Sequence, residues 1–386
     1  MAERLSVAQD VVGSIPPSRP IFHGPQGAAL LSHSISVNED SHKKSDFDEL
    51  ALGLAPFEPL RGLTNGHLQT IVGNFLPRPP LQLRAESETV EVDPADGSRV
   101  LCHCHWQPLK VRATRLTVVL VHGLEGSSDS QYILGLTARA WSAGCNVVRM
   151  NMRTCGGTET LTPTLYHSGL SADLGAVVRH YAEKFGLERV ALVGYSMGGN
   201  MVLKLAGEWG NRRPLCAVAA VCPAIDLAPG SDALHQGVNR LYEWRFLLGL
   251  KARYQRKARL FPEIYAPADE IGPIRSIREF DNKIVARYWD FKDADDYYAH
   301  AASARVVDRI SVPTMILQAQ DDPFIRLSAK TRAKLVANPA ISFIETRHGG
   351  HCAYLGRDPG NEIHWAEASV MRFLQAKTEP LAVGQA

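Results

Sequence analysis

The chain has 386 residues, of which 45% are hydrophobic and 21% are charged, and its formal net charge is +2. These values exclude a disordered, collagen-like or disulfide-scaffold protein and leave room for a large buried core. A nearly neutral chain without a long Lys/Arg block does not favour nucleic-acid binding.

The sequence also lacks membrane and export signals. No apolar stretch reaches the roughly 18 residues needed to span a bilayer, so no integral membrane segment is expected. Residues 1–25 lack the continuous apolar core of a signal peptide. The seven cysteines are an odd number scattered along the chain, which is typical of free thiols in a reducing cytosol. Together these features predict a cytoplasmic protein.

The pattern of elements predicts an α/β fold. Residues 1–46 are rich in Pro, Gly, Ser and polar residues, and they predict a mobile N-terminal arm. Residues 47–377 alternate short β-branched runs with helical patterns, as in a mostly parallel central sheet with helices on both faces. Residues 378–386 predict a flexible tail. The expected strands are 116–121, 146–152, 189–193, 216–222, 314–319 and 341–345, and the expected helices are 131–143, 171–185, 197–209 and 365–376.

The interval 224–310 interrupts this alternation with amphipathic, aromatic and basic stretches. A long connection inside a compact domain is usually functional, so we expect a helical cap insertion rather than a decoration that only pads the sheet. Its basic side chains could attract an acidic substrate or a lipid headgroup, but a solvated helix face is the favoured interpretation. These side chains are Arg245, Lys251, Arg253, Arg256 and Lys257.

A candidate nucleophile lies between an expected strand and an expected helix, in Gly194-Tyr195-Ser196-Met197-Gly198. A G-x-S-x-G motif in this context is typical of a nucleophile elbow, a strained turn that exposes the serine hydroxyl. The N-terminus of the following helix directs free N–H groups to where negative charge would develop. Ser196 is therefore the candidate nucleophile, and an inert serine in a Gly-rich turn is the alternative.

A serine hydroxyl needs an adjacent base, and the base needs an acid that orients it. In α/β folds that carry such a nucleophile elbow, the three residues follow one another along the chain in the order Ser, acid, His. Asp321 and Asp322 end the strand 314–319, and Asp322 is favoured because it directly precedes a proline turn. His351 follows two glycines that allow a tight turn, which favours it over His348 as the base.

A second oxyanion donor is expected in the loop 122–128, which follows the strand 116–121. The backbone N–H of Leu124 would pair with that of Met197. Such a donor contributes about 3 kcal/mol of transition-state stabilisation.

Other motifs carry less weight. In Cys102-His103-Cys104-His105 a strand would place the cysteines on one face and the histidines on the other, so a tetrahedral metal site is not expected. We predict an edge strand there. Cys155 could be a reactive thiol, although a structural thiol is favoured. No P-loop or dinucleotide fingerprint follows a strand, and neither metal nor cofactor is expected.

Several further segments carry a family resemblance. They are Asn65-Gly66-His67-Leu68-Gln69-Thr70, His122-Gly123-Leu124-Glu125-Gly126-Ser127, Asn151-Met152-Arg153, Tyr166-His167-Ser168-Gly169, Phe280-Asp281 and Asp296-Tyr297-Tyr298. With the elbow motif, they make residues 50–376 resemble the α/β-hydrolase superfamily. The chain is most similar to its bacterial branch, which is related to the plant embryogenesis-associated proteins and the animal abhydrolase-domain lipases and esterases.

This resemblance implies a serine hydrolase of carboxylic esters, similar to carboxylesterases or monoacylglycerol lipases, with Ser196, Asp322 and His351 as its triad. Animal relatives carry an N-terminal membrane anchor that is not found here, so small soluble esters or monoacylglycerols are expected rather than membrane lipids. An acyltransferase or thioesterase on the same triad and a non-catalytic ligand-binding member of the fold are the alternatives. The sequence does not identify partner proteins.

Overall fold

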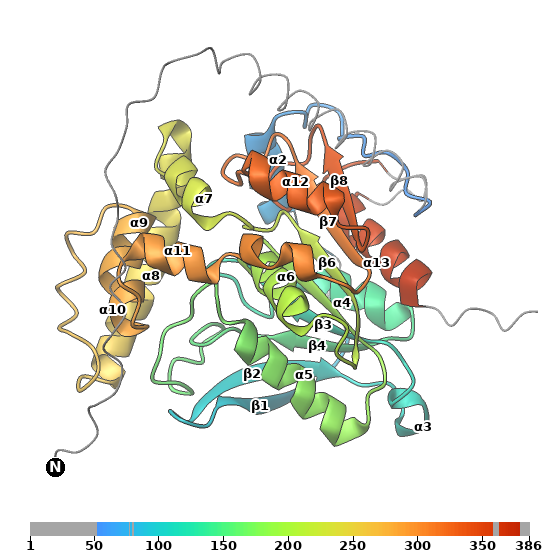
Figure 1. Ribbon diagram of the computed structural model, residues 1–386, viewed down its shortest axis with the longest axis horizontal. Helices are drawn as coiled ribbons and strands as arrows, with labels where there is room; N and C mark the ends of the chain where they lie inside the picture. Colours follow the sequence, from blue (N-terminus) through green and yellow to red (C-terminus); the bar gives the residue numbers. More distant parts are fainter. Residues whose placement is uncertain (1–51, 77, 79–80, 358–362, 379–386) are drawn as a thin grey trace, which may run out of the picture.

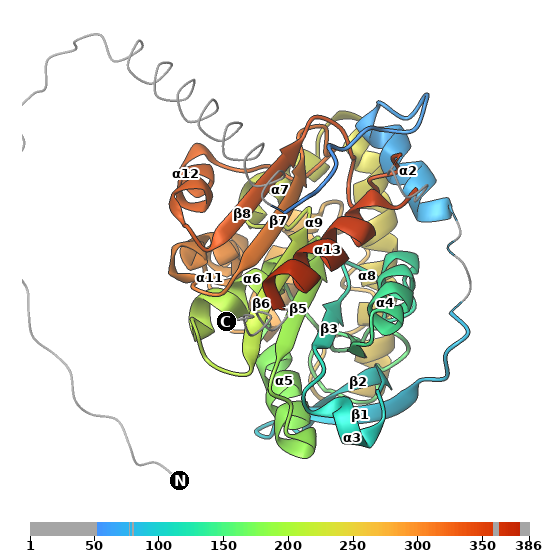
Figure 2. The same cartoon turned by 90° about the vertical axis from the view of Figure 1, so that its right-hand side faces the viewer.

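The computed structural model describes residues 52–76, 78, 81–357 and 363–378. Eight strands of this part form one sheet in the order β1-β2-β4-β3-β5-β6-β7-β8 (Figures 1 and 2). They are β1 (Glu86–Asp93), β2 (Ser98–His105), β3 (Thr117–Val121), β4 (Asn146–Met150), β5 (Val190–Tyr195), β6 (Leu215–Val221), β7 (Thr314–Ala319) and β8 (Ile341–Thr346). β2 pairs antiparallel with β1 and β4, and all other neighbours are parallel. The expected mostly parallel sheet is confirmed.

The central strands divide the core into two layers. Every residue of β3 is buried, as expected for a parallel strand covered on both faces. Because successive side chains point to opposite faces, Val119 and Val121 join one hydrophobic cluster, while Val118 and Leu120 join the other. This alternation requires helices on both faces of the sheet.

Four helices provide most of that cover. α5 (Ser171–Phe185) and α6 (Met197–Trp209) pack together on the face of the first cluster. α4 (Gln131–Ser142) and α13 (Trp365–Thr378) pack together on the opposite face (Figure 2). Trp365 is buried there. α2 (Gly66–Phe75), α3 (Leu109–Arg112) and α12 (Ala329–Ala337) complete the helices outside the β6–β7 connection in the described part of the chain.

The sequence prediction of an edge strand at 102–105 is wrong. These residues belong to β2, which lies between β1 and β4. The edge strand is β1, whose residues are mostly polar and exposed or half-buried, with Val90 as its fully buried side chain. A single buried position gives too weak an alternation to predict a strand from the sequence.

A group of helices fills the connection between β6 and β7 and extends beyond one side of the sheet (Figure 1). It contains α7 (Leu227–Leu234), α8 (Arg240–Leu260), α9 (Ile277–Phe280), a π-helical turn (Asp281–Val285), α10 (Ala286–Tyr288) and α11 (Ala294–Ala301). We call residues 224–310 the cap. Its limits as a functional insertion stay a prediction, and the predicted arm at 1–46 lies outside the described residues, as does the tail from 379 onward.

The interpretation of the basic cap residues as a solvated helix face is wrong for two of them. Arg253 and Lys257 are buried in α8. The Lys257 ammonium donates to the carbonyl oxygens of Glu159 and Thr162, and burial lowers the pKa of Lys257 to about 8. Side chains that hold α8 against the sheet domain cannot attract a ligand from solvent.

Within the described residues, no helix combines the length and apolar character needed to cross a bilayer.

A buried ion pair fastens α5 to the end of β4. The Arg153 guanidinium contacts the Asp173 carboxylate through two hydrogen bonds of 2.7 Å, and both side chains are at most 3% exposed. Arg153 also donates to Ser98 Oγ at 3.0 Å. Asp96 and Asp93 also lie 3.5 and 3.7 Å from the guanidinium, but both are more exposed than Asp173. Removing the Asp173 charge therefore takes away the buried partner of Arg153.

We therefore expect Asp173→Asn to lower the free energy of unfolding by about 3 kcal/mol, measured by urea denaturation. The matched control is Asp308→Asn, which breaks an exposed pair with Lys334 and costs less than about 1 kcal/mol. Equal losses in the two variants would contradict the structural role of the buried pair.

Candidate active site

Ser196 occupies the turn between β5 and α6 in a strained backbone conformation, with φ 54° and ψ −115°. A Cβ atom on Gly194 would lie 2.2 Å from the Gly198 carbonyl oxygen, and one on Gly198 would lie 2.4 Å from the Val121 carbonyl oxygen. The two glycines of the motif are therefore needed because backbone atoms occupy the space of a side chain. The turn lies at the carboxyl end of the central strands, where α/β proteins collect their site residues.

Asp322 and His351 are joined directly. Asp322 Oδ2 lies 2.8 Å from His351 Nδ1, and Asp322 Oδ1 accepts the backbone N–H groups of Phe324 and Ile325 at 3.1 and 2.9 Å. Burial of Asp322 opposes ionisation, but the imidazole and the two N–H groups outweigh it. The pKa of Asp322 is therefore lowered from its ordinary value.

Asp321 makes different contacts. Its Oδ1 accepts the Gly350 N–H at 2.9 Å, and its Oδ2 faces His348 Nδ1 at 3.4 Å. The structure therefore pairs the two aspartates with two different histidines. Asp322, the favoured candidate, is the one that contacts His351.

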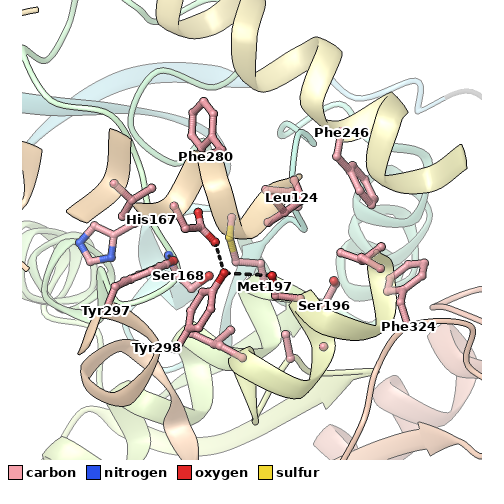
Figure 3. A pocket seen from close by; sticks show the side chains of 18 of the residues that line it. Leu124, His167, Ser168, Ser196, Met197, Phe246, Phe280, Tyr297, Tyr298 and Phe324 are labelled. Carbon is pink, nitrogen blue, oxygen red and sulfur yellow. Dashed lines mark hydrogen bonds between the residues drawn. The ribbon is translucent and has the colours of Figure 1, made fainter. Parts of the chain in front are cut away.

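The loop that carries His351 lies beside the turn of Ser196. The Val221 carbonyl oxygen accepts the Ser196 N–H at 2.9 Å and the Cys352 thiol at 3.5 Å. The rings of Phe324 and His351 are 4.1 Å apart, and Phe324 lines the same pocket as Ser196 (Figure 3). The Ser196 hydroxyl has no hydrogen bond within the described residues, and such bonds are often long before substrate binds.

The loop after β3 offers a free backbone donor. The N–H groups of Gly123 and Glu125 donate to the hydroxyls of Tyr132 and Tyr166, respectively. Those of Leu124 and Met197 have no acceptor in the described part of the chain, and both residues line the pocket with Ser196. The two predicted oxyanion donors therefore share a cavity with the serine (Figure 3).

Glu125 connects this loop to the cap. Its carboxylate accepts two hydrogen bonds from the Arg253 guanidinium, at 3.1 and 3.2 Å, and one from the Tyr166 hydroxyl at 2.7 Å. Its backbone has a φ of 55°, which is uncommon for a non-glycine residue. The position of Leu124, the preceding residue, is thus tied to the cap helix α8.

Helix α2 supports the loops of Asp322 and His351 from the outside. Thr70 Oγ1 accepts the His351 N–H at 2.9 Å and donates to the Gly66 carbonyl oxygen at 2.7 Å. A Cβ atom on Gly66 would lie 1.9 Å from the Asp321 carbonyl oxygen. The side-chain amide of Gln69 exchanges hydrogen bonds with the backbone of Leu355.

Three side chains near the serine could hold a metal ion. The ligand atoms of Cys222, His351 and Cys352 lie within 4.8 Å of one another. His351 already contacts Asp322 through Nδ1, so an ion bound there would occupy the remaining imidazole nitrogen.

Residues 102–105 do not form a ligand cluster in the described structure. The Cys104 thiol contacts Tyr181, and His103 contacts Ser87 on the other face of β2.

Comparison with known proteins identifies the family of the chain. A family model described as the alpha/beta hydrolase fold matches residues 117–358. The chain belongs to the α/β-hydrolase family. It is 33% identical over 330 residues to Escherichia coli YheT, which carries a provisional esterase name; the match covers 84% of this chain and 94% of YheT. These two matches confirm the expectation that the chain is a hydrolase.

Two further relatives confirm the resemblance predicted from the sequence. The embryogenesis-associated protein EMB8 of Picea glauca is 26% identical over 335 residues, which cover 83% of this chain and 72% of EMB8. Phospholipase ABHD3 of Mus musculus is 28% identical over 319 residues, which cover 81% of this chain and 76% of that relative. This chain is therefore related to the embryogenesis-associated proteins and to the ABHD3 phospholipases.

Sequence reasoning gave no structural role to Thr70, Glu125 or Asp281. All three lie in segments that carried the family resemblance, and no other feature of the sequence indicates that they have a role in the site. Their contacts join segments far apart in the chain, such as Thr70 to His351 and Glu125 to Arg253. Hydrophobic periodicity and local spacing do not report such contacts.

Thr70 provides a test of the support from α2. We expect Thr70→Val to lower the rate of p-nitrophenyl ester hydrolysis roughly tenfold, because the His351 loop loses its hydrogen-bond acceptor and the imidazole shifts. The matched control, Thr70→Ser, keeps the hydroxyl and most of the activity. Equal rates in both variants would show that the hydrogen bond does not position His351.

Proposed function

We propose that this α/β-hydrolase is a serine hydrolase that cleaves carboxylic esters with Ser196, His351 and Asp322 as its triad. The observation that supports it most strongly is the 2.8 Å hydrogen bond between Asp322 and His351, next to the strained turn of Ser196. A buried carboxylate held ionised by an imidazole is suited to fix the tautomer of a catalytic base.

In the proposed reaction, His351 takes the proton of Ser196 as its oxygen attacks the ester carbonyl carbon. The N–H groups of Met197 and Leu124 donate to the oxyanion, and His351 passes the proton to the leaving alcohol. His351 then takes a proton from water, which attacks the acyl-enzyme and frees the acid. His351 returns this proton to the Ser196 oxygen as the acyl–oxygen bond breaks, which restores the hydroxyl.

The pocket indicates the class of substrate. Its wall is mostly apolar, with Phe246, Phe280 and Phe324 among the lining side chains (Figure 3). Such a wall suits an acyl chain or another apolar part of an ester. The names of YheT and ABHD3 support ester hydrolysis, and small esters or monoacylglycerols are the substrates we favour over membrane lipids.

The direct test compares the wild type with Ser196→Ala on p-nitrophenyl esters from acetyl to palmitoyl. We expect the variant to lose at least about 10³-fold in kcat. The dependence on chain length in the wild type reports the depth of the pocket. Equal rates would contradict Ser196 as the nucleophile, whereas turnover that requires an added alcohol would identify an acyltransferase.

Asp322→Asn and Asp321→Asn separate the two adjacent carboxylates. Loss of the Asp322 carboxylate is expected to lower kcat by about 10⁴-fold, because the imidazole takes the wrong tautomer. Asp321→Asn retains an acceptor for the Gly350 N–H and is expected to cost less than about tenfold. The reverse order of losses would assign the orienting role to Asp321.

A further inference from the structure

The pocket beside Ser196 also contains a buried carboxyl group that the proposed mechanism does not use. Asp281 lies at the start of the π-helical turn and lines the pocket. Its Oδ2 accepts a hydrogen bond from the Tyr298 hydroxyl at 2.6 Å, and that hydroxyl lies 2.9 Å from Ser231 Oγ (Figure 3). The three residues come from three elements of the cap: the π-helical turn, α11 and α7.

This carboxyl group has one oxygen without a partner. Asp281 Oδ1 accepts no hydrogen bond in the part of the chain that the structure describes, and no cation forms an ion pair with Asp281 there. The nearby Arg278 is engaged by Asp232 and Asp295 at 3.0 and 2.5 Å. Burial accordingly raises the pKa of Asp281 to about 7.

The Asp281 carboxyl group lies among apolar side chains. Phe280, Ile277 and Val285 contribute to the same wall of the pocket. An acceptor in an apolar wall is costly unless something hydrogen-bonds to it, and in ligand pockets a few such polar groups fix orientation and specificity. A substrate group can satisfy Asp281 Oδ1 in the bound state.

The chemistry of the cluster selects a neutral hydrogen-bond donor. The ionised Asp281 carboxylate repels carboxylates and phosphates. Tyr298 and Ser231 contribute two hydroxyl groups to the cluster but no positive charge that would attract such anions. An ammonium group would lose its strong hydration on entering an apolar cavity. A hydroxyl group loses far less, and it can donate its one proton to the free oxygen of Asp281.

We propose that Asp281, Tyr298 and Ser231 bind a hydroxyl group of the substrate, so that the enzyme prefers hydroxylated esters over esters of plain alkyl chains. This inference rests on the proposed ester hydrolysis at Ser196. A plain ester that fills the pocket leaves the Asp281 acceptor unpaired, whereas a hydroxylated ester pairs it. The difference is expected to change kcat/KM by about tenfold or more.

The test uses pairs of esters that differ in one hydroxyl group. p-Nitrophenyl ω-hydroxyalkanoates of increasing length are compared with alkanoates in which a methyl group replaces the hydroxyl. Glycerol monoesters are compared with propyl esters of the same acids. The first series places the hydroxyl on the acyl side and the second on the alcohol side. We expect the wild type to favour the hydroxylated member by about tenfold in one of them.

Asp281→Leu is expected to abolish this preference, measured as the ratio of kcat/KM between the paired esters and therefore independent of any change in the overall rate. Retained hydrolysis of the plain esters would show that the variant is folded with an intact triad. Asp269→Leu, at an exposed position of the cap, is the matched control and keeps the preference. If Asp281→Leu does not fold, Tyr298→Phe, which keeps the ring and removes the hydroxyl, is expected to reduce the preference several-fold.

The outcomes separate the two proposals. Plain esters hydrolysed without any preference for a hydroxyl would overturn the inference and leave the proposed function standing. A preference for esters that carry an ammonium group would overturn the assignment to a neutral hydroxyl. If the wild type hydrolyses no ester, the proposed function fails. Calorimetric binding of 1,6-hexanediol against 1-hexanol to Ser196→Ala then tests the pocket, and equal affinities would overturn the inference.

Discussion

The strained turn at Ser196 is the constraint on which the rest of the site depends. A serine with φ 54° is held in place by bonds from several directions: its N–H donates to Val221, and its carbonyl oxygen accepts from Asn200 and Ala224. Such strain persists where the surrounding structure over-determines it. The Val221 carbonyl oxygen also accepts the Cys352 thiol, so the conformation that exposes Ser196 is coupled to the loop of His351.

The cap forms part of the site, although it is inserted far along the chain from the loop after β3. Arg253 of α8 contacts Glu125 and the Thr154 carbonyl oxygen, and it is buried. A buried ion pair is weak evidence for overall stability but constrains geometry strongly. Because Leu124 directly precedes Glu125, a movement of α8 would move the N–H group that we assign to the oxyanion. Cap position and donor geometry are therefore coupled.

The sequence was informative where a signal is local. The six predicted strands and four predicted helices are present with ends within two residues, because buried parallel strands read as continuous apolar runs. The contact of Asp322 with His351 agrees with their predicted pairing. The strand β1, the burial of Lys257 and the support from Thr70 could not be predicted in this way. Each depends on partners distant in the chain, and polar residues give no periodicity that would reveal them.

Two buried aspartates in this molecule show how the environment divides their chemistry. Asp322 receives an imidazole and two backbone N–H groups, and its pKa is lowered. Asp281 receives one phenol, and burial raises its pKa to about 7. Burial acts against ionisation at both sites, and at Asp322 the charge interaction with His351, together with the hydrogen bonds from His351 and the two N–H groups, outweighs it. A fully satisfied carboxylate is suited to hold a neighbouring imidazole in place, whereas an incompletely satisfied one in a pocket wall is suited to accept a hydrogen bond from a bound molecule.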